Sequence, residues 1–239
     1  MSPIGRALPD LPDWEEVLSA AARLQRILPD AVLVGGTASA VHAAHRFSRD
    51  ADHVLTDLKP RFDAVLGQLE SVAGWKTARI SRPVQILGSL DGIETGVRQL
   101  IRAAPLETTV INHKGEPLTV PTDGEILRIK SILILKRNAT RDYLDFVALA
   151  ALIGDQRIAT ELTSFDALYP QNNGESALQQ LQVQLANPLP FDLDEVAPGL
   201  SEYKHLILRW HDWRAVKAEC IRISAVLFDA SCEAQPPAP

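Results

Sequence analysis

The chain has 239 residues, of which 24 are basic and 30 are acidic, so its formal net charge is −6. Hydrophobic residues make up 46% and charged residues 23%, a balance that allows an ordinary packed core and excludes collagen-like, coiled-coil and disordered chains. The two cysteines, Cys220 and Cys232, have no CxxC or histidine-rich neighbourhood, which argues against a zinc site and fits a reducing compartment. The N-terminus does not resemble a leader, and no apolar run reaches the ~18 residues of a membrane span. We therefore expect a cytoplasmic protein without a membrane partner.

The first part of the chain predicts alternating helices and strands. Apolar residues recur every three or four positions from 14 to 28, and Pro29 ends this helical pattern. A short β-branched run then meets a double glycine and an alanine-rich segment, which indicates a buried strand that turns directly into a helix. The elements expected are a helix at 14–28, a strand at 31–34, a helix at 37–46, a strand at 48–55 and a helix at 60–73.

The later part of the chain changes from β-like to helical patterns. We expect consecutive antiparallel strands at 75–80, 84–88 and 93–100, and a last strand at 118–120. Beyond Pro121 the predicted helices span 123–136, 141–153, 159–168, 176–186 and 203–228. The predicted fold class is therefore α/β (α+β): a small mixed sheet flanked by helices at 1–120, an all-helical module at 121–230 and a disordered tail at 231–239.

The last predicted helix allows two interpretations. It has basic side chains with Trp210 and Trp213 between them, and this composition suits RNA, because rings stack on bases and cations meet phosphates. Its apolar residues, however, repeat every three or four positions, which describes a face packed on a core more simply. We favour the core interpretation, in which Cys220 is buried and unreactive.

One constellation carries chemistry: Gly35-Gly36-Thr37, then twelve residues, then Asp50-Ala51-Asp52. Two carboxylates at i and i+2 on a strand share a face roughly 6–7 Å apart, close enough to hold magnesium between their oxygens. A strand that ends in two glycines before a helix offers backbone N–H groups without Cβ obstruction, which suits phosphates. Either feature alone is more often a tight turn or a solvated strand face, whereas together and at this spacing they indicate a metal–triphosphate site.

These residues resemble the polymerase-beta-like nucleotidyltransferase superfamily, in which a hydrophobic strand, Gly-Gly or Gly-Ser, a helix and Asp-x-Asp or Asp-x-Glu follow one another. Within it the chain is most similar to the abortive-infection nucleotidyltransferases of the AbiEii/AbiGii type, which act as toxins in type IV toxin–antitoxin pairs. Three stretches carry this closer resemblance: 45–50 (HRFSRD), 129–130 (IK) and 137–145 (RNATRDYLD).

The resemblance implies roles for individual residues. Asp50 and Asp52 would ligate Mg²⁺, and Gly35, Gly36, Thr37 and Ser48 would contact the nucleotide. Lys130 would neutralise triphosphate charge with Arg137, and Asp142 would orient the nucleophile or the lysine. The implied substrate is a nucleoside triphosphate (NTP), the implied acceptor is tRNA or another RNA, and the implied partner is a cognate antitoxin.

One departure from the superfamily concerns the third carboxylate, which usually lies on a neighbouring strand and helps bind the metal that activates the acceptor hydroxyl. In the register we favour, Gly96 takes this position and has no side chain. Glu94 lies two residues earlier on the same strand face and is the candidate for a third catalytic and metal-binding acid. Two alternatives therefore stay open: a non-catalytic nucleotide-binding or interaction module of the same fold, and a small-molecule, antibiotic-modifying nucleotidyltransferase.

Overall fold

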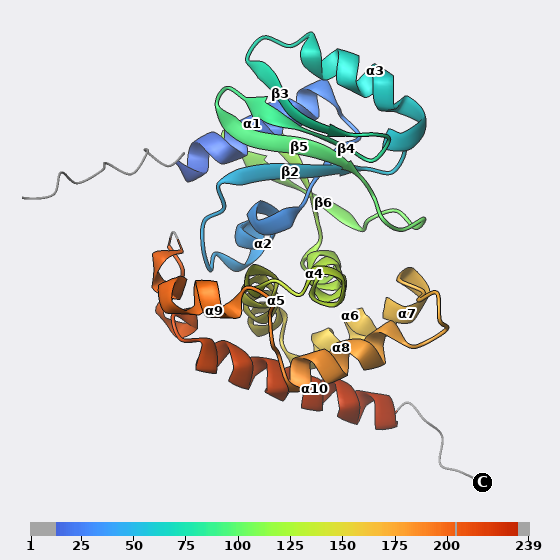
Figure 1. Ribbon diagram of the computed structural model, residues 1–239, viewed down its shortest axis with the longest axis vertical. Helices are drawn as coiled ribbons and strands as arrows, with labels where there is room; N and C mark the ends of the chain where they lie inside the picture. The colour runs from blue at the N-terminus through green and yellow to red at the C-terminus, as the bar shows by residue number, and fades with distance from the viewer. Residues whose placement is uncertain (1–12, 204, 234–239) are drawn as a thin grey trace, which may run out of the picture.

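The structure is a computed structural model that describes residues 13–203 and 205–233. Its N-terminal half is built around a five-stranded mixed sheet (Figure 1). The strand order is β1-β2-β5-β4-β3, with β2 parallel to β5 and the other pairs antiparallel. A separate hairpin pairs β6 with β7. The strands are β1 (Val32–Leu33), β2 (Asp50–Leu55), β3 (Trp75–Ser81), β4 (Gln85–Leu90), β5 (Ile93–Gln99), β6 (Thr108–His113) and β7 (Glu116–Pro121).

Helices lie on both sides of this sheet and form the C-terminal half (Figure 1). Near the sheet, α1 and α3 lie on one side, whereas α2, α4 and α5 lie on the other. The long α10 runs across the far side of α5 and α8. The helices are α1 (Trp14–Ile27), α2 (Gly35–Ala43), α3 (Leu58–Glu70), α4 (Asp123–Arg137), α5 (Thr140–Ile153), α6 (Asp155–Leu162), α7 (Phe165–Leu168), α8 (Ala177–Ala186), α9 (Leu193–Val196), η1 (Ala197–Glu202), η2 (Leu208–Trp210) and α10 (Trp213–Glu233).

Two apolar cores hold these layers together. The smaller core fills the space between α1, α3 and the outer face of the sheet, and it includes Phe62, Trp75, Ile86 and Leu90. The larger core includes buried residues from α1, α2, β7 and the C-terminal helices in one cluster. The two sequence halves therefore share buried apolar surface, and the division near residue 121 stays a prediction.

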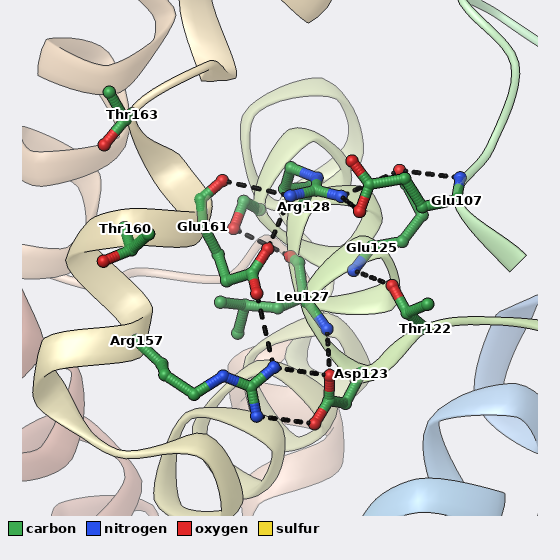
Figure 2. A network of polar contacts seen from close by, with 12 residues as sticks. Glu107, Thr122, Asp123, Glu125, Leu127, Arg128, Arg157, Thr160, Glu161 and Thr163 are labelled. Carbon is green, nitrogen blue, oxygen red and sulfur yellow. Dashed lines mark hydrogen bonds and ion pairs between the residues drawn. The ribbon is translucent and has the colours of Figure 1, made fainter. Parts of the chain in front are cut away.

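An ion network around the buried side chains of Glu125 and Arg128 fixes the start of α4 against α6 and the loop before β6 (Figure 2). The guanidinium of Arg128 contacts the carboxylates of Glu107 and Glu161 at 2.6 Å each and donates to Glu125 at 3.0 Å. Arg102 also donates to Glu125, at 2.8 Å, and to the hydroxyl of Tyr169 at 3.2 Å. The network thereby extends from the base of α4 to an aromatic ring in the wall of the cavity described below.

The fold class that the sequence predicts is confirmed, with local exceptions. The strand β6 was not predicted, and the helix expected at 159–168 is divided into α6 and α7. The helix expected from 203 begins only at Trp213, because His205 takes a φ of 56° and residues 208–210 form a separate 3-10 turn. Residues 231–233 belong to α10, and the rest of the predicted tail lies outside the described residues. Within the described part of the chain, no helix combines the length and apolar character that crossing a membrane requires.

Candidate active site

The acid pair and the glycine turn lie side by side. Asp50 and Asp52 share the face of β2 that alternates with its buried residues, and the N–H of Val34 donates to the carbonyl of Asp52 at 2.8 Å. Gly35 begins α2 with a φ of 73°, a conformation that favours glycine, and a Cβ atom there would lie 3.6 Å from the Cβ of Asp52. The turn from β1 into α2 therefore places free backbone N–H groups next to the two carboxylates.

Gly36 makes room for two polar side chains of the loop before β2. A Cβ atom at Gly36 would lie 2.5 Å from Nη2 of Arg46 and 2.8 Å from Oγ of Ser48. Ser48 donates to Oδ1 of Asp50 at 2.7 Å, which fixes that carboxylate. The helix start, a guanidinium and a hydroxyl thus meet at one point beside the acid pair.

The side chain of Thr37 does not face the cavity, so only its backbone N–H at the start of α2 is left to contact a phosphate. Its side chain is fully buried, and its hydroxyl donates to the backbone carbonyl of Asp50 at 2.5 Å. A hydroxyl used in this way is not available to a phosphate. Thr37 instead ties the first turn of α2 to β2 and so positions the acid pair relative to the glycine turn.

A buried cluster of charges joins α4, α5 and the loop before β2. Lys130 contacts Asp145 at 2.7 Å and Asp142 at 3.4 Å, and all three side chains are at most 1% exposed. Arg137 grips Asp142 with two bonds of 2.5 and 2.6 Å. Arg46 grips Asp145 with bonds of 2.7 and 3.0 Å. Lys130 is therefore held by two carboxylates, each of which also binds an arginine.

Burial acts differently on the two key aspartates. For Asp145, burial alone would favour the neutral acid, but Arg46, Lys130 and His45 hold its pKa well below the usual range. For Asp52, burial raises the pKa above its ordinary value, and the neighbouring Asp50 adds to this shift while Arg98 opposes it. Asp145 is thus held in its ionised form by its cationic neighbours. The ionised form of Asp52 is destabilised by burial, and a bound cation would stabilise it.

These groups surround one cavity of about 740 Å³ between the sheet and the helices. Arg137 and the exposed Arg141 reach it from α4 and α5, and Tyr203 closes it from the segment after η1. Its lining brings together nine of the predicted site residues or their neighbours: Gly35, Gly36, Ser48, Asp50, Asp52, Glu94, Lys130, Arg137 and Arg141. Thr37 and Asp142 lie behind this surface, the latter fully buried beneath Arg137 and Lys130.

The strand beside the acid pair does not present a third acid opposite Asp52. The register places Glu94 opposite Asp50 and Gly96 opposite Asp52. Glu94 is exposed, and Nη2 of Arg98 lies 3.6 Å from Oδ1 of Asp52. Over residues 13–203 and 205–233, no three His, Cys, Asp or Glu side chains converge closely enough to hold a metal ion.

The residues present fit one hard cation bound through two carboxylates. Asp50 and Asp52 offer oxygen ligands on one strand face, and burial together with Asp50 raises the pKa of Asp52, an effect that Arg98 opposes only in part. Mg²⁺ is commonly held by one or two carboxylates, with substrate phosphates and waters as its other ligands. The donor set therefore suits a metal that arrives with a triphosphate and does not suit an all-protein cage.

Sequence reasoning assigned no specific role to three contributors to this site: Asp145, Arg46 and Arg98. The first two lie in the stretches 137–145 and 45–50 that carry the family resemblance. Asp145 looks like an ordinary acid in the first turns of a helix, although its spacing of three from Asp142 puts both on one face. The parallel pairing of β2 with β5 brings Arg98 into the site. Arg98 lies opposite Val54, and its guanidinium reaches Asp52. The resemblance implied that the strand at 93–100 neighbours the acid pair, with Gly96 at the third-acid position, but it assigned no role to Arg98, two residues later on the same face.

Comparisons with known proteins bear on the fold. A protein from H. pylori assigned as a nucleotidyltransferase superposes with a TM-score of 0.53 at 14% identity, over 96% of this chain and 100% of that one. The chain therefore shares the fold of that protein. The antibiotic-resistance factor ANT(2″)-Ia gives a TM-score of 0.47 at 11% identity, over 64% of this chain and 94% of that chain. No family model matches the chain.

Curated relatives in sequence are much longer proteins. The chain is 28% identical over 251 residues to the heme uptake protein MmpL11 of Mycobacterium tuberculosis, a match that covers 93% of this chain and 24% of that protein. MmpL11 of Mycolicibacterium smegmatis is 28% identical over 225 residues, 91% of this chain and 22% of that protein. The chain spans about a quarter of the length of these relatives.

Proposed function

We propose that this chain binds a nucleoside triphosphate with Mg²⁺ and transfers a nucleotidyl group from it to RNA, as the toxin-like component of a type IV toxin–antitoxin pair. One observation carries the proposal: the acid pair, the glycine turn and the helical cations line the same cavity. The resemblance to the abortive-infection nucleotidyltransferases supplies the acceptor, with the 3′ end of tRNA foremost, and the antitoxin partner.

Different residues of the cavity would bind the phosphates and the metal. The N–H groups at the start of α2 face the phosphates. The guanidinium of Arg46 packs directly against Gly36 in the wall of the cavity and adds positive charge behind them. Lys130 and Arg137 add positive charge from the opposite wall. Asp50 and Asp52 would hold Mg²⁺, which supplies neutralisation of the triphosphate charge when it is bound. Transfer then joins an acceptor oxygen to the α-phosphorus and releases pyrophosphate, so positioning and cationic stabilisation supply the catalysis.

The test is transfer of label from each of the four α-³²P nucleoside triphosphates to total RNA. We expect Mg²⁺-dependent labelling by the wild-type chain with one or more triphosphates and its loss in Asp52→Ala. Asp229→Ala, on the exposed side of α10, is the matched control and is expected to label RNA normally. Transfer to an aminoglycoside and not to RNA would identify a small-molecule enzyme and refute the RNA acceptor.

A second candidate function is nucleotide binding without transfer. It is favoured by the packing at Gly96, where the neighbouring Leu87 fills the space that a third carboxylate needs. In that case triphosphate and Mg²⁺ bind to the wild type and not to Asp52→Ala, while no acceptor is labelled. Calorimetric titration with each triphosphate, run beside the labelling assay, separates the two candidates.

The toxin role has a separate test in cells. Induced expression of the wild-type chain is expected to arrest growth, because modified tRNA ends cannot be charged, and Asp52→Ala is expected to be harmless at equal protein level. Growth arrest by both proteins would argue against transfer as its cause.

A further inference from the structure

The strands β5, β4 and β3 present a face that continues from the acid pair. Register places Asp52, Gly96, Leu87 and Arg79 in one row across four strands. A second row runs from Asp50 through Glu94 and Ser89 to Lys76. With strands ~4.8 Å apart, each row spans about 14 Å from the acid pair to the outer strand.

This face is open to solvent over its outer two strands. Lys76 and Arg79 on β3 are exposed, and Leu87 and Ser89 on β4 are half-buried. The opposite face of the same strands is covered instead, since Trp75 and Ile86 pack with α3 in the smaller core. The enclosed wall of the cavity, in contrast, is made by the glycine turn, Arg46 and the cations of α4. A second substrate therefore has an unobstructed approach to the acid pair across β4 and β3.

The cations around this approach lack acidic partners. Over the described ranges, no ion pair involves Lys76 or Arg79 on the open face, nor Arg49 or Arg141 at the rim of the cavity. Most other arginines of the chain are paired, and its formal net charge is −6. These four cations thus flank the acid pair, where they complement a chain of phosphates, whereas Lys59, Lys136 and Lys217, which also have no ion pair in the described part of the chain, lie outside the cavity and the open face.

We propose that the open face of β5, β4 and β3 binds the acceptor as a single strand of RNA. Lys76 and Arg79 meet the phosphates behind the reacting 3′ end, which itself lies over Glu94 and the acid pair. The inference rests on the proposed transfer to RNA. The inference adds where the RNA binds and from which direction it approaches. The RNA strand runs across the sheet from β3 toward β2, and the triphosphate lies on the enclosed side of the acid pair.

The test is binding of a fluorescein-labelled single-stranded RNA with a free 3′ hydroxyl, measured by anisotropy at several salt concentrations. The variant carries Lys76→Glu with Arg79→Glu. The matched control carries Lys59→Glu, at the start of α3 on the covered side of the sheet, with Lys217→Glu on α10, so that both proteins change net charge equally. Triphosphate binding with Mg²⁺ is titrated in parallel for every protein.

The open-face variant is expected to bind the RNA at least about tenfold more weakly at ~0.1 M salt. Each lost phosphate contact also lowers the salt slope by roughly 0.7, so the slope is expected to fall by about 1.4. Triphosphate binding is expected to stay unchanged in both proteins, and RNA binding is expected to stay within twofold of wild type in the control.

RNA affinity and salt slope that match the wild type in the open-face variant would overturn the inference. An equal loss in the control would do so as well. If the wild-type chain binds triphosphate but no RNA, this surface is excluded while nucleotide binding stands. If it binds RNA through this face but no triphosphate, the proposed function fails and the surface stands, so the two failures are distinguishable.

Discussion

Leu87 lies directly over Gly96, with its Cδ2 atom 2.6 Å from the place that a Cβ atom at residue 96 would take. The carbonyl oxygen of Ile86 lies 2.7 Å from the same place. Because Gly96 is opposite Asp52, this is the position from which a third carboxylate would reach the metal. A third carboxylate is therefore missing for two reasons: residue 96 is a glycine, and the packing of β4 against β5 leaves no room for a side chain there.

The first prediction is that Gly96→Asp destabilises the protein without improving the site. Overpacking of this kind costs about 1–3 kcal/mol, since both a side chain and a backbone atom must move. Gly67→Ala is the control, because nothing lies within 4 Å of a Cβ there and alanine favours the helix by up to ~1 kcal/mol. Urea unfolding measures both changes. A Gly96→Asp protein as stable as the wild type, with tighter Mg²⁺ binding, would contradict this account.

The second prediction concerns the buried carboxylate of Asp145. Asp145→Asn leaves Arg46 and Lys130 without their shared anion, and breaking such a buried pair costs about 3–5 kcal/mol. We expect a large fall in the midpoint of urea unfolding. Asp229→Asn, on the exposed side of α10, serves as the comparison.

The same carboxylate predicts part of the acid sensitivity of the fold. Its folded pKa lies below the ordinary value of ~3.9, so the unfolded chain takes up the proton first and stability is lost as pH falls below about 4. The wild type is therefore expected to lose unfolding free energy more steeply in this window than Asp145→Asn. Equal slopes for the two proteins would show that Asp145 is not the anchor described here.

The third prediction is that Asp52→Asn stabilises the metal-free protein. Burial and Asp50 raise the pKa of Asp52, so the folded state holds the proton more tightly than the unfolded state and the ionised form costs stability at neutral pH. An amide removes this cost, and we expect a higher free energy of unfolding for the variant in a chelator-containing buffer. Added Mg²⁺ with triphosphate is expected to raise the melting temperature of the wild type and not that of the variant. A variant that melts below the wild type without metal would refute the claim that the ionised form of Asp52 destabilises the folded protein.

The local half of the site was predictable from the sequence, because it depends on short-range rules. A strand, two glycines, a helix and Asp-x-Asp determine one another within about 20 residues, and the structure places them together. The other wall depends on distant partners. Asp145 bonds to His45 and Arg46 across 100 and 99 positions, so its burial could not be read from its place in a helix.

Two errors in the predicted elements have similar causes. The residues of β6 are mostly exposed and pair only with β7, so no apolar alternation marked them. Their turn at Lys114 and Gly115, both with positive φ, was the available signal. In the last helix, a spacing of three to four also fits the 3-10 turn at 208–210, so the periodicity did not reveal the break before Trp213.

The final prediction concerns His53, on the face of β2 opposite the acid pair. Burial lowers its pKa from 6.5 to about 4, and its ring bonds to the carbonyl of Ala51 at 2.9 Å. Since the unfolded chain binds the proton first, stability is expected to fall as pH drops from about 6.5 toward 4, by about 2 kcal/mol between pH 7 and pH 4.5.

Replacing this ring with an apolar side chain should remove that dependence. His53→Met keeps a similar volume and cannot titrate, so the difference in unfolding free energy between pH 7 and pH 4.5 is expected to shrink by about 2 kcal/mol. Urea unfolding at the two pH values measures it. Because His53 lies on the covered side of the sheet, triphosphate binding at neutral pH is expected to be unaffected. An undiminished pH difference in the variant would assign the acid sensitivity between pH 7 and pH 4.5 to groups other than His53.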